Sequence, residues 1–339
     1  AYVLFPLLFI FLVYKSFHLS IPYFWDELGV YSKAALYMYD HHVTLLPGVL
    51  PPELSRGHPL LCAAYFGTMY KLLGPHVWVG HLSALFLSCG LLVMTYMLAR
   101  YVWGYSVAIL ATVLLMLQPV FIAQSSMVLP EIMLALFCLT ALFSYLRGNL
   151  AWYAICSSLA IMTKETAIFL PFAIISFEII KYACLRKFDR LDYIAIGASL
   201  LPLVVWILFL VAQRFTHGWF FFPLHADYVS FSFSQIWSRL GYYLSFLFKG
   251  QGRYLWTIVF VLAFVLWTTE NRKKLLPTMR TSFKDMLSNE KPYLVLTLYL
   301  GVGLMVSMLN FHFARYTLFL LPICCILVSV ATIYLLRLV

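Results

Sequence analysis

Long apolar runs separated by short polar breaks make up most of the chain. A helix needs about 20 mostly apolar residues to cross the hydrocarbon core of a bilayer. The pattern predicts an all-α integral membrane protein with about ten transmembrane helices and with interfacial helices in its outer loops, built as one polytopic domain over residues 1–339. The predicted spans are residues 2–18, 77–99, 105–120, 131–147, 150–163, 166–183, 193–213, 254–269, 293–310 and 316–336.

One short apolar stretch, residues 59–73, decides the orientation of the chain. If it crossed the membrane, every later loop would change sides relative to the first span. If it lies along the interface, the basic clusters within 181–190 and 272–291 fall on one side, which the positive-inside rule identifies as the cytoplasm. We therefore predict cytoplasmic loops at 184–192 and 270–292, and outer loops at 19–76 and 214–253.

Both predicted outer loops are rich in aromatic residues. The first contains Tyr23-Phe24-Trp25 and the second contains Trp219-Phe220-Phe221-Phe222. Tyr and Trp favour the headgroup boundary of a bilayer, so we expect these loops to lie against the membrane. The prediction is a multi-pass protein of the cell inner (plasma) membrane with an active site that faces outward.

The composition agrees with lipid as the main solvent, because 63% of the residues are hydrophobic and 11% are charged. A net charge of +10 would suit nucleic acid, but the basic residues flank apolar runs and cover no single face, which argues against that partner.

The 7 cysteines lie almost entirely in apolar stretches, and we interpret them as core residues. Five histidines lack a metal-ligand spacing such as HExxH and are interpreted as interfacial or core residues. They are His41, His42, His76, His81 and His217.

Several ionisable residues stand at the ends of the apolar spans, in a chain with only 13 carboxylates. A charge near hydrocarbon is costly and usually functional, although a single charge at a span end can also extend to the interface. The predicted topology places the whole set at one level, on the outer side of the membrane. Helix ends at an interface do not require this many charged side chains. We therefore predict a single polar site. The set is Asp26, Glu27, His58, Glu131, Lys164-Glu165 and Arg315.

The order of the short motifs around these residues resembles a known family. The motifs are Asp26-Glu27, Gly57-His58-Pro59-Leu60, Leu129-Pro130-Glu131, Thr163-Lys164-Glu165, and Arg315-Tyr316 leading to Leu321-Pro322. Each recurs by chance in long chains. In this order, within a frame of about ten spans, the sequence resembles membrane glycosyltransferases of the GT-C class, in the branch with protein O-mannosyltransferases and lipid A aminoarabinose transferases.

The resemblance implies a role for each residue of the site. The Asp of the first outer loop is the catalytic base in that family, and this role falls on Asp26. The basic residues near the cavity hold the phosphate of the donor. The resemblance thus implies donor-phosphate binding by Lys164, Arg315 and His58, with Glu27 and Glu131 as supporting acids.

The sequence also departs from the family pattern. Family members often have a second Pro at the position of Leu60. Many carry a large extra domain, in a late outer loop or at the C-terminus, for which we find no counterpart in this sequence. Because those parts are expected to help hold the acceptor, the identity of the acceptor stays open between protein, lipid and glycan.

The chemistry of a polyprenyl-phosphate donor fits such a site. Its tail requires an opening toward lipid, the acceptor hydroxyl requires a base, and the departing phosphate requires fixed positive charge. We predict a hexosyl- or pentosyltransferase that acts at the non-cytoplasmic face and inverts the anomeric centre. Cationic side chains can neutralise a monophosphate, so no cofactor is required, and a divalent metal is an alternative.

The competing prediction is a transporter or flippase for a lipid-linked or anionic substrate. Buried charges in transporters lie near the bilayer midplane, in both halves of an internal repeat. In this sequence we find no such repeat, and the charges gather at one predicted face.

The predicted topology can be tested by labelling. Single cysteines or tags placed near residues 188 and 280 should be accessible only from the cytoplasm, because both lie in the basic clusters. Those near residues 45 and 230 should be accessible only from outside. If the positions near 45 and 188 were labelled from the same side, the predicted topology would be wrong.

Overall fold

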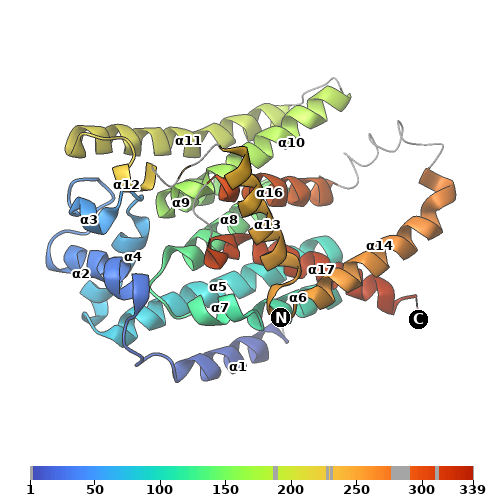
Figure 1. Ribbon diagram of the computed structural model, residues 1–339, viewed down its shortest axis with the longest axis horizontal. Helices are drawn as coiled ribbons and strands as arrows, with labels where there is room; N and C mark the ends of the chain where they lie inside the picture. Colours follow the sequence, from blue (N-terminus) through green and yellow to red (C-terminus); the bar gives the residue numbers. More distant parts are fainter. Residues whose placement is uncertain are drawn as a thin grey trace.

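The computed structural model describes residues 3–185, 190–226, 229, 232–275, 291–309 and 313–338, which form helices and contain no strand. Most of the long helices run roughly parallel or antiparallel to one another (Figure 1). The predicted cytoplasmic loops fall largely outside the described residues, which omit 186–189 and 276–290.

Apolar helices occupy all ten predicted spans. Four segments are long and apolar enough to cross a membrane: α5 (Val77–Trp103), η2 with α10 (Glu165–Leu185), α11 (Arg190–His217), and η4 with α17 (Ala314–Leu336). Six apolar helices are shorter, namely α1 (Leu4–Ser16), α6 (Tyr105–Met116), α8 (Pro130–Leu146), α9 (Leu150–Thr163), and the apolar parts of α14 (Tyr254–Leu275) and α16 (Lys291–Met308). The chain is a multi-pass membrane protein, and ten crossings stay a prediction.

Short helices fill the predicted outer loops. The loop 19–76 contains η1 (Glu27–Tyr31), α2 (Ser32–Asp40), α3 (Pro52–Ser55) and α4 (Leu61–Leu73), and the loop 214–253 contains α12 (Pro223–Ala226), α13 (Phe233–Phe248) and η3 (Gly250–Gly252). The 13 residues of α4 extend about 20 Å, which is less than the core of a bilayer. This length agrees with a helix that does not cross. In Figure 1, α2, α3, α4 and α12 gather at one end of the long helices.

One predicted span, 105–120, is divided in the structure. The helix α6 ends at Met116, and the short helix α7 (Pro119–Gln124) follows. Pro119 stands in the first turn of α7, where its missing N–H costs nothing, but it cannot continue the preceding helix. The predicted span 105–120 therefore combined α6 with the start of α7, which Pro119 separates.

Tight turns pair neighbouring helices. Gly148 has a φ of +74°, and it ends the turn after α8, while the side chain of Asn149 accepts a hydrogen bond from the N–H of Trp152 at 3.2 Å and caps α9. Gly104, with a φ of +87°, turns the chain between α5 and α6. Glycine adopts this left-handed conformation without the steric cost that a side chain adds.

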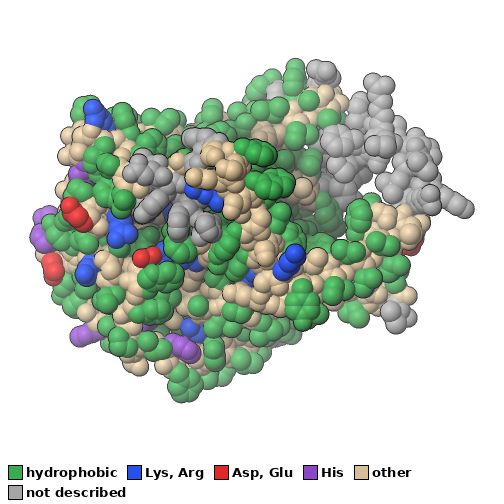
Figure 2. Space-filling view, in the orientation of Figure 1, with side chains coloured by type: hydrophobic (Ala, Val, Ile, Leu, Met, Phe, Trp, Pro, Cys, Tyr) green, Lys and Arg blue, Asp and Glu red, His purple; other side chains and the backbone are tan. Residues whose placement is uncertain are grey.

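Apolar side chains fill the space between the helices and also cover their outer faces. A large buried cluster includes Phe169, Tyr299 and Phe319, whose rings lie 4.6–6.4 Å apart. Hydrophobic side chains also cover much of the visible surface, and many charged and histidine side chains lie toward the end with α2–α4 (Figure 2). An outer surface of this kind suits lipid.

Close packing at Gly80 on α5 gives a test of the fold. A Cβ at this position would lie 2.5 Å from the hydroxyls of Tyr23 and Tyr70, which bond to each other, and 2.8 Å from Val128 Cγ2. Gly80→Ala should therefore lower the free energy of unfolding by about 1–3 kcal/mol. The matched change Gly197→Ala on α11, with nothing within 4 Å, should raise it by about 0.5–1 kcal/mol. Thermal unfolding in detergent compares the two, and equal midpoints would contradict the packing.

Candidate functional site

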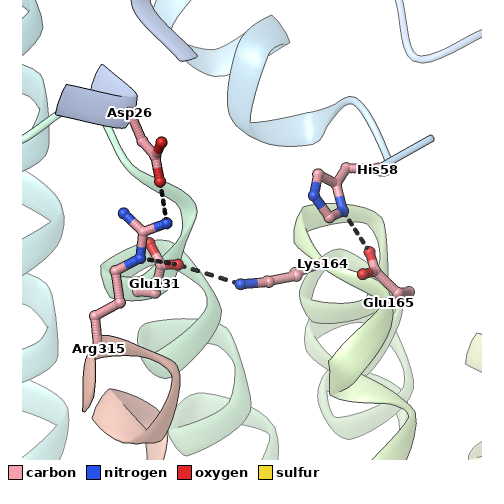
Figure 3. Close-up of polar contacts among 6 residues, drawn as sticks. All are labelled: Asp26, His58, Glu131, Lys164, Glu165 and Arg315. Atoms are coloured by element: carbon pink, nitrogen blue, oxygen red, sulfur yellow. Dashed lines mark hydrogen bonds and ion pairs between the residues drawn. The ribbon is translucent and has the colours of Figure 1, made fainter. Parts of the chain in front are cut away.

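Four of the predicted site residues meet in one network of charges. Lys164 Nζ lies 3.2 Å from Glu131 Oε1, and Arg315 Nε lies 3.6 Å from the same oxygen. The guanidinium of Arg315 also donates a hydrogen bond from Nη2 to Oδ2 of Asp26. The chain of contacts therefore runs from Asp26 through Arg315 and Glu131 to Lys164 (Figure 3).

Helix ends position each member of this charge network. Glu131 follows Pro130 in the first turn of α8, where the helix dipole favours a carboxylate. Lys164 has extended backbone angles between α9 and the short helix η2 (Glu165–Ile168). Arg315 stands near the start of η4 (Ala314–Leu320), and Asp26 directly precedes η1. Since consecutive helices alternate in direction, the start of α8 and the end of α9 lie at the same end of the bundle.

The network is buried except at one carboxylate. Glu131, Lys164 and Arg315 are 2%, 5% and 6% exposed, whereas the side chain of Asp26 is 29% exposed. Buried charges require partners because their transfer out of water costs several kcal/mol. Two cations and two carboxylates balance here, and Asp26 is the member that a second reactant can reach.

The network has unused hydrogen-bonding capacity. Among the described residues, no partner bonds to Nε or Nη1 of Arg315 or to Oε2 of Glu131. Buried polar atoms without partners are costly and call for an explanation. Nε stays within 3.6 Å of Glu131 Oε1 in the ion pair, and a guanidinium with such unused capacity is suited to the oxygens of an anionic group.

Aromatic rings surround both cations. Lys164 Nζ lies 3.9 Å from the ring centre of Tyr316. Arg315 Cζ lies 5.1 Å from the ring of Trp25, 5.3 Å from Tyr316 and 5.6 Å from Phe313. Cations are attracted to the faces of such rings, so these contacts help to hold both side chains where a ligand could meet them.

His58 lies beside the charge network and is bonded to a different carboxylate. Its Nδ1 is 2.9 Å from Oε2 of Glu165, the residue after Lys164 (Figure 3). Both side chains are partly exposed. The expected role of His58 in phosphate binding stays a prediction, because the observed contact links the turn between α3 and α4 to η2.

Glu27 points away from the other site residues. Its Oε1 accepts a hydrogen bond from the N–H of Val128 at 2.7 Å and lies 3.1 Å from Nε2 of His81, and the side chain is 1% exposed. Val128 precedes Glu131 by three residues. The carboxylate of Glu27 therefore ties the Asp26 segment to the Glu131 segment, and no reactant can reach it in this arrangement.

A shallow pocket opens between Lys164 and His58, under α2, α3 and α4. Its polar lining comprises Tyr31, Ser55, His58, Thr163 and Lys164, and its other walls are mostly apolar. Burial, with the nearby carboxylate of Glu131, raises the pKa of the Tyr31 phenol well above its usual range. Burial likewise raises the pKa of the Cys62 thiol in the pocket wall. Both groups are therefore neutral at pH 7.

No group of three or more His, Cys, Asp or Glu side chains within the described ranges is arranged to hold a metal ion. The cationic side chains of the network are the positive charges that the site offers.

Sequence reasoning gave Glu165 and Tyr316 no individual role, although both stand in the motifs that carry the resemblance, and it placed Trp25 only at the headgroup boundary. The contacts of Glu165 with His58, of Tyr316 with Lys164 and of Trp25 with Arg315 join residues at least 107 positions apart in the chain. Spacing along the sequence carries no signal for such pairs, and only the proximity to charged residues in the motifs could have drawn attention to them.

Comparison with known proteins finds similarity in structure. No protein-family model matches the sequence, and the search of curated proteins gave no match. The crystal structure of ArnT from Cupriavidus metallidurans bound to undecaprenyl phosphate matches with a TM-score of 0.68 and 17% identity, over 97% of this chain and 59% of that one. Its apo state matches with a TM-score of 0.64 and 16% identity, over 96% and 59%.

The match extends over nearly all of this chain, which spans about 59% of the length of ArnT. The resemblance in the sequence motifs is confirmed at the level of the fold. The chain has the fold of ArnT, a GT-C aminoarabinose transferase.

Proposed function

We propose that this protein is a glycosyltransferase that moves a sugar from a polyprenyl-phosphate donor to an acceptor hydroxyl at the non-cytoplasmic face of the membrane. The observation that carries the proposal is the buried pair of cations, Lys164 and Arg315, whose guanidinium keeps unused hydrogen-bonding capacity among the described residues. It is supported by a fold shared with a protein that was crystallised with undecaprenyl phosphate.

The charge of the donor changes during such a reaction. A sugar linked through phosphate to a polyprenyl chain is a phosphodiester with one negative charge, whereas the released polyprenyl phosphate is a monoester with a charge of about −1.5 to −2. Fixed cations therefore stabilise the departing phosphate more than the bound donor. This difference is what accelerates a reaction, and it assigns Lys164 and Arg315 to the leaving group.

Arg315 can connect donor binding to the base. Its guanidinium is bonded to Asp26 in the structure. A phosphate that binds to Arg315 competes with this carboxylate, since the four charges of the network already balance. Asp26 released from Arg315 is free to accept a proton.

The proposed step is a single displacement. Asp26 removes the proton of the acceptor hydroxyl, the hydroxyl oxygen bonds to the anomeric carbon, and the bond from that carbon to the phosphate oxygen breaks. The bonding electrons leave with the phosphate, next to Lys164 and Arg315. One displacement inverts the anomeric centre. The proposed acceptors are protein, lipid or glycan, the sugar is a hexose or pentose, and the site faces outward from the cell's inner membrane.

A transporter or flippase would need its charges along a pathway near the midplane. Here the network joins residues at helix ends. Radiolabelled undecaprenyl-phosphate-linked sugars, given to protein in nanodiscs, separate the two functions. A transferase releases undecaprenyl phosphate and labels an acceptor, whereas a transporter leaves the donor intact.

Asp26→Asn tests the proposed base. The change keeps the size of the side chain and removes its basicity, so turnover should fall by about 100-fold or more. Binding of undecaprenyl phosphate should persist, since the cations are unchanged. Asp40→Asn, at the exposed end of α2, is the matched control and should retain activity. Near-normal transfer by purified Asp26→Asn would remove Asp26 from the role of base.

Lys164→Gln and Arg315→Gln test the phosphate site. Each should weaken binding of undecaprenyl phosphate and should slow turnover at saturating donor, because positive charge matters more as the phosphate departs. Arg315→Lys should recover only part of the loss, since an ammonium lacks the planar fork of donors. Binding to detergent-purified variants is measured beside turnover.

Two controls separate charge from folding in this experiment. Lys164→Gln leaves Glu131 buried without its lysine, so the double variant Lys164→Gln/Glu131→Gln restores the balance of charge and should still bind the lipid phosphate weakly. Lys33→Gln, on the exposed surface of α2, should bind it normally. Unchanged affinity and turnover in both single variants would contradict the assignment of the phosphate site.

A further inference from the structure

Trp25, directly before the proposed base, has an unusual backbone conformation. Its φ is +53°, and it shares a positive φ with only two other non-glycine residues in the described part of the chain, Arg56 and Gln251. A bulky side chain pays a steric penalty in this region, and such residues concentrate at functional sites. The surrounding contacts must therefore over-determine the position of the indole.

These contacts place the indole against the proposed phosphate site. Its ring centre lies 5.1 Å from Cζ of Arg315 and 5.9 Å from the ring centre of Phe313, with the two ring planes at 85°. The next residue in the chain, Asp26, bonds to the same guanidinium. The strained backbone thus holds an aromatic ring against the cation proposed to receive the phosphate, next to the bond between that cation and the proposed base.

The indole is nevertheless largely uncovered. Trp25 is 58% exposed, whereas Arg315 is 6% exposed. Burial of the indole therefore does not explain the strain. An aromatic face carries partial negative charge, which suits the polarised C–H groups on one face of a sugar ring.

We propose that Trp25 is the binding platform for the sugar ring of the lipid-linked donor. The inference rests on the proposed function. A phosphate on Arg315 touches the guanidinium that Trp25 covers, and the sugar is esterified to that phosphate, so its ring must lie within a few bonds of Arg315. The indole contacts one face of this ring and orients the anomeric carbon toward the hydroxyl that Asp26 deprotonates.

A simpler role is anchoring at the headgroup boundary, where Trp is common. Phe24 is the matched control, since it is an exposed aromatic residue of the same segment, 54% exposed, and would share that role. The variants are Trp25→Gly, Trp25→Ala, Trp25→Phe and Phe24→Ala.

The measurement is the ratio of two affinities in detergent. Each variant is titrated with undecaprenyl phosphate and with undecaprenyl phosphate linked to mannose, glucose or arabinose, using the sugar that the unmodified protein binds most tightly. Trp25→Gly and Trp25→Ala should lower the preference for the sugar-linked lipid by about five-fold, whereas Trp25→Phe should keep most of it. Phe24→Ala should leave it unchanged.

Thermal unfolding provides a second readout. If the left-handed backbone persists, Trp25→Gly should unfold at a higher temperature than Trp25→Ala, because glycine adopts a positive φ without penalty. Equal unfolding temperatures would contradict the strained backbone from which the inference is argued.

Three results would overturn the platform. These are an unchanged affinity ratio in Trp25→Gly, an equal loss in Phe24→Ala, and the absence in the unmodified protein of any preference for a sugar-linked lipid. Failure of the proposed function is distinguishable, because the unmodified protein would then not bind undecaprenyl phosphate even without a sugar.

Discussion

The position of Glu131 between two cations controls the geometry of the site. Its Oε1 lies 3.2 Å from Lys164 Nζ and 3.6 Å from Arg315 Nε, and the residue is 2% exposed. In surroundings that admit little water, neither cation could stay charged and buried without such a partner. One carboxylate therefore brings the end of α9 and the start of η4 together at the N-terminus of α8, although Lys164 and Arg315 are far apart in the chain.

A second layer of contacts fixes the loop 19–76, predicted to lie outside, on this network. Glu27, bonded to Val128 and His81, joins the Asp26 segment to the segment before Glu131. His58, in the turn between α3 and α4, bonds to Glu165 and joins this turn to η2. These pairs explain how a loop outside the helices can hold Asp26 against Arg315. They also leave Asp26 as the accessible carboxylate of the network, which is the property that a base requires.

The apolar helices could be predicted from the sequence, because they depend on local hydrophobic length. Charges at the ends of the predicted spans also singled out Asp26, Glu131, Lys164 and Arg315, which meet in one network in the structure, and their roles stay predictions. The partners could not be predicted, since the pairing of Glu27 with His81 depends on how a loop packs against α5. The positive φ of Trp25 could not be predicted from the sequence either, because the usual signal for a left-handed residue is a glycine, and none stands there. Pro119 is a local signal that the span 105–120 is divided. The span was predicted from its apolar length alone, so this signal was not used.

The central claim is that Arg315 and Lys164 bind the phosphate of a polyprenyl lipid and that this binding releases Asp26. A structure of the protein with undecaprenyl phosphate tests it most directly. We expect phosphate oxygens within about 4 Å of Lys164 Nζ and of the Arg315 guanidinium, with Asp26 no longer bonded to Arg315. A phosphate bound away from both cations, with the bond between Asp26 and Arg315 intact, would contradict it.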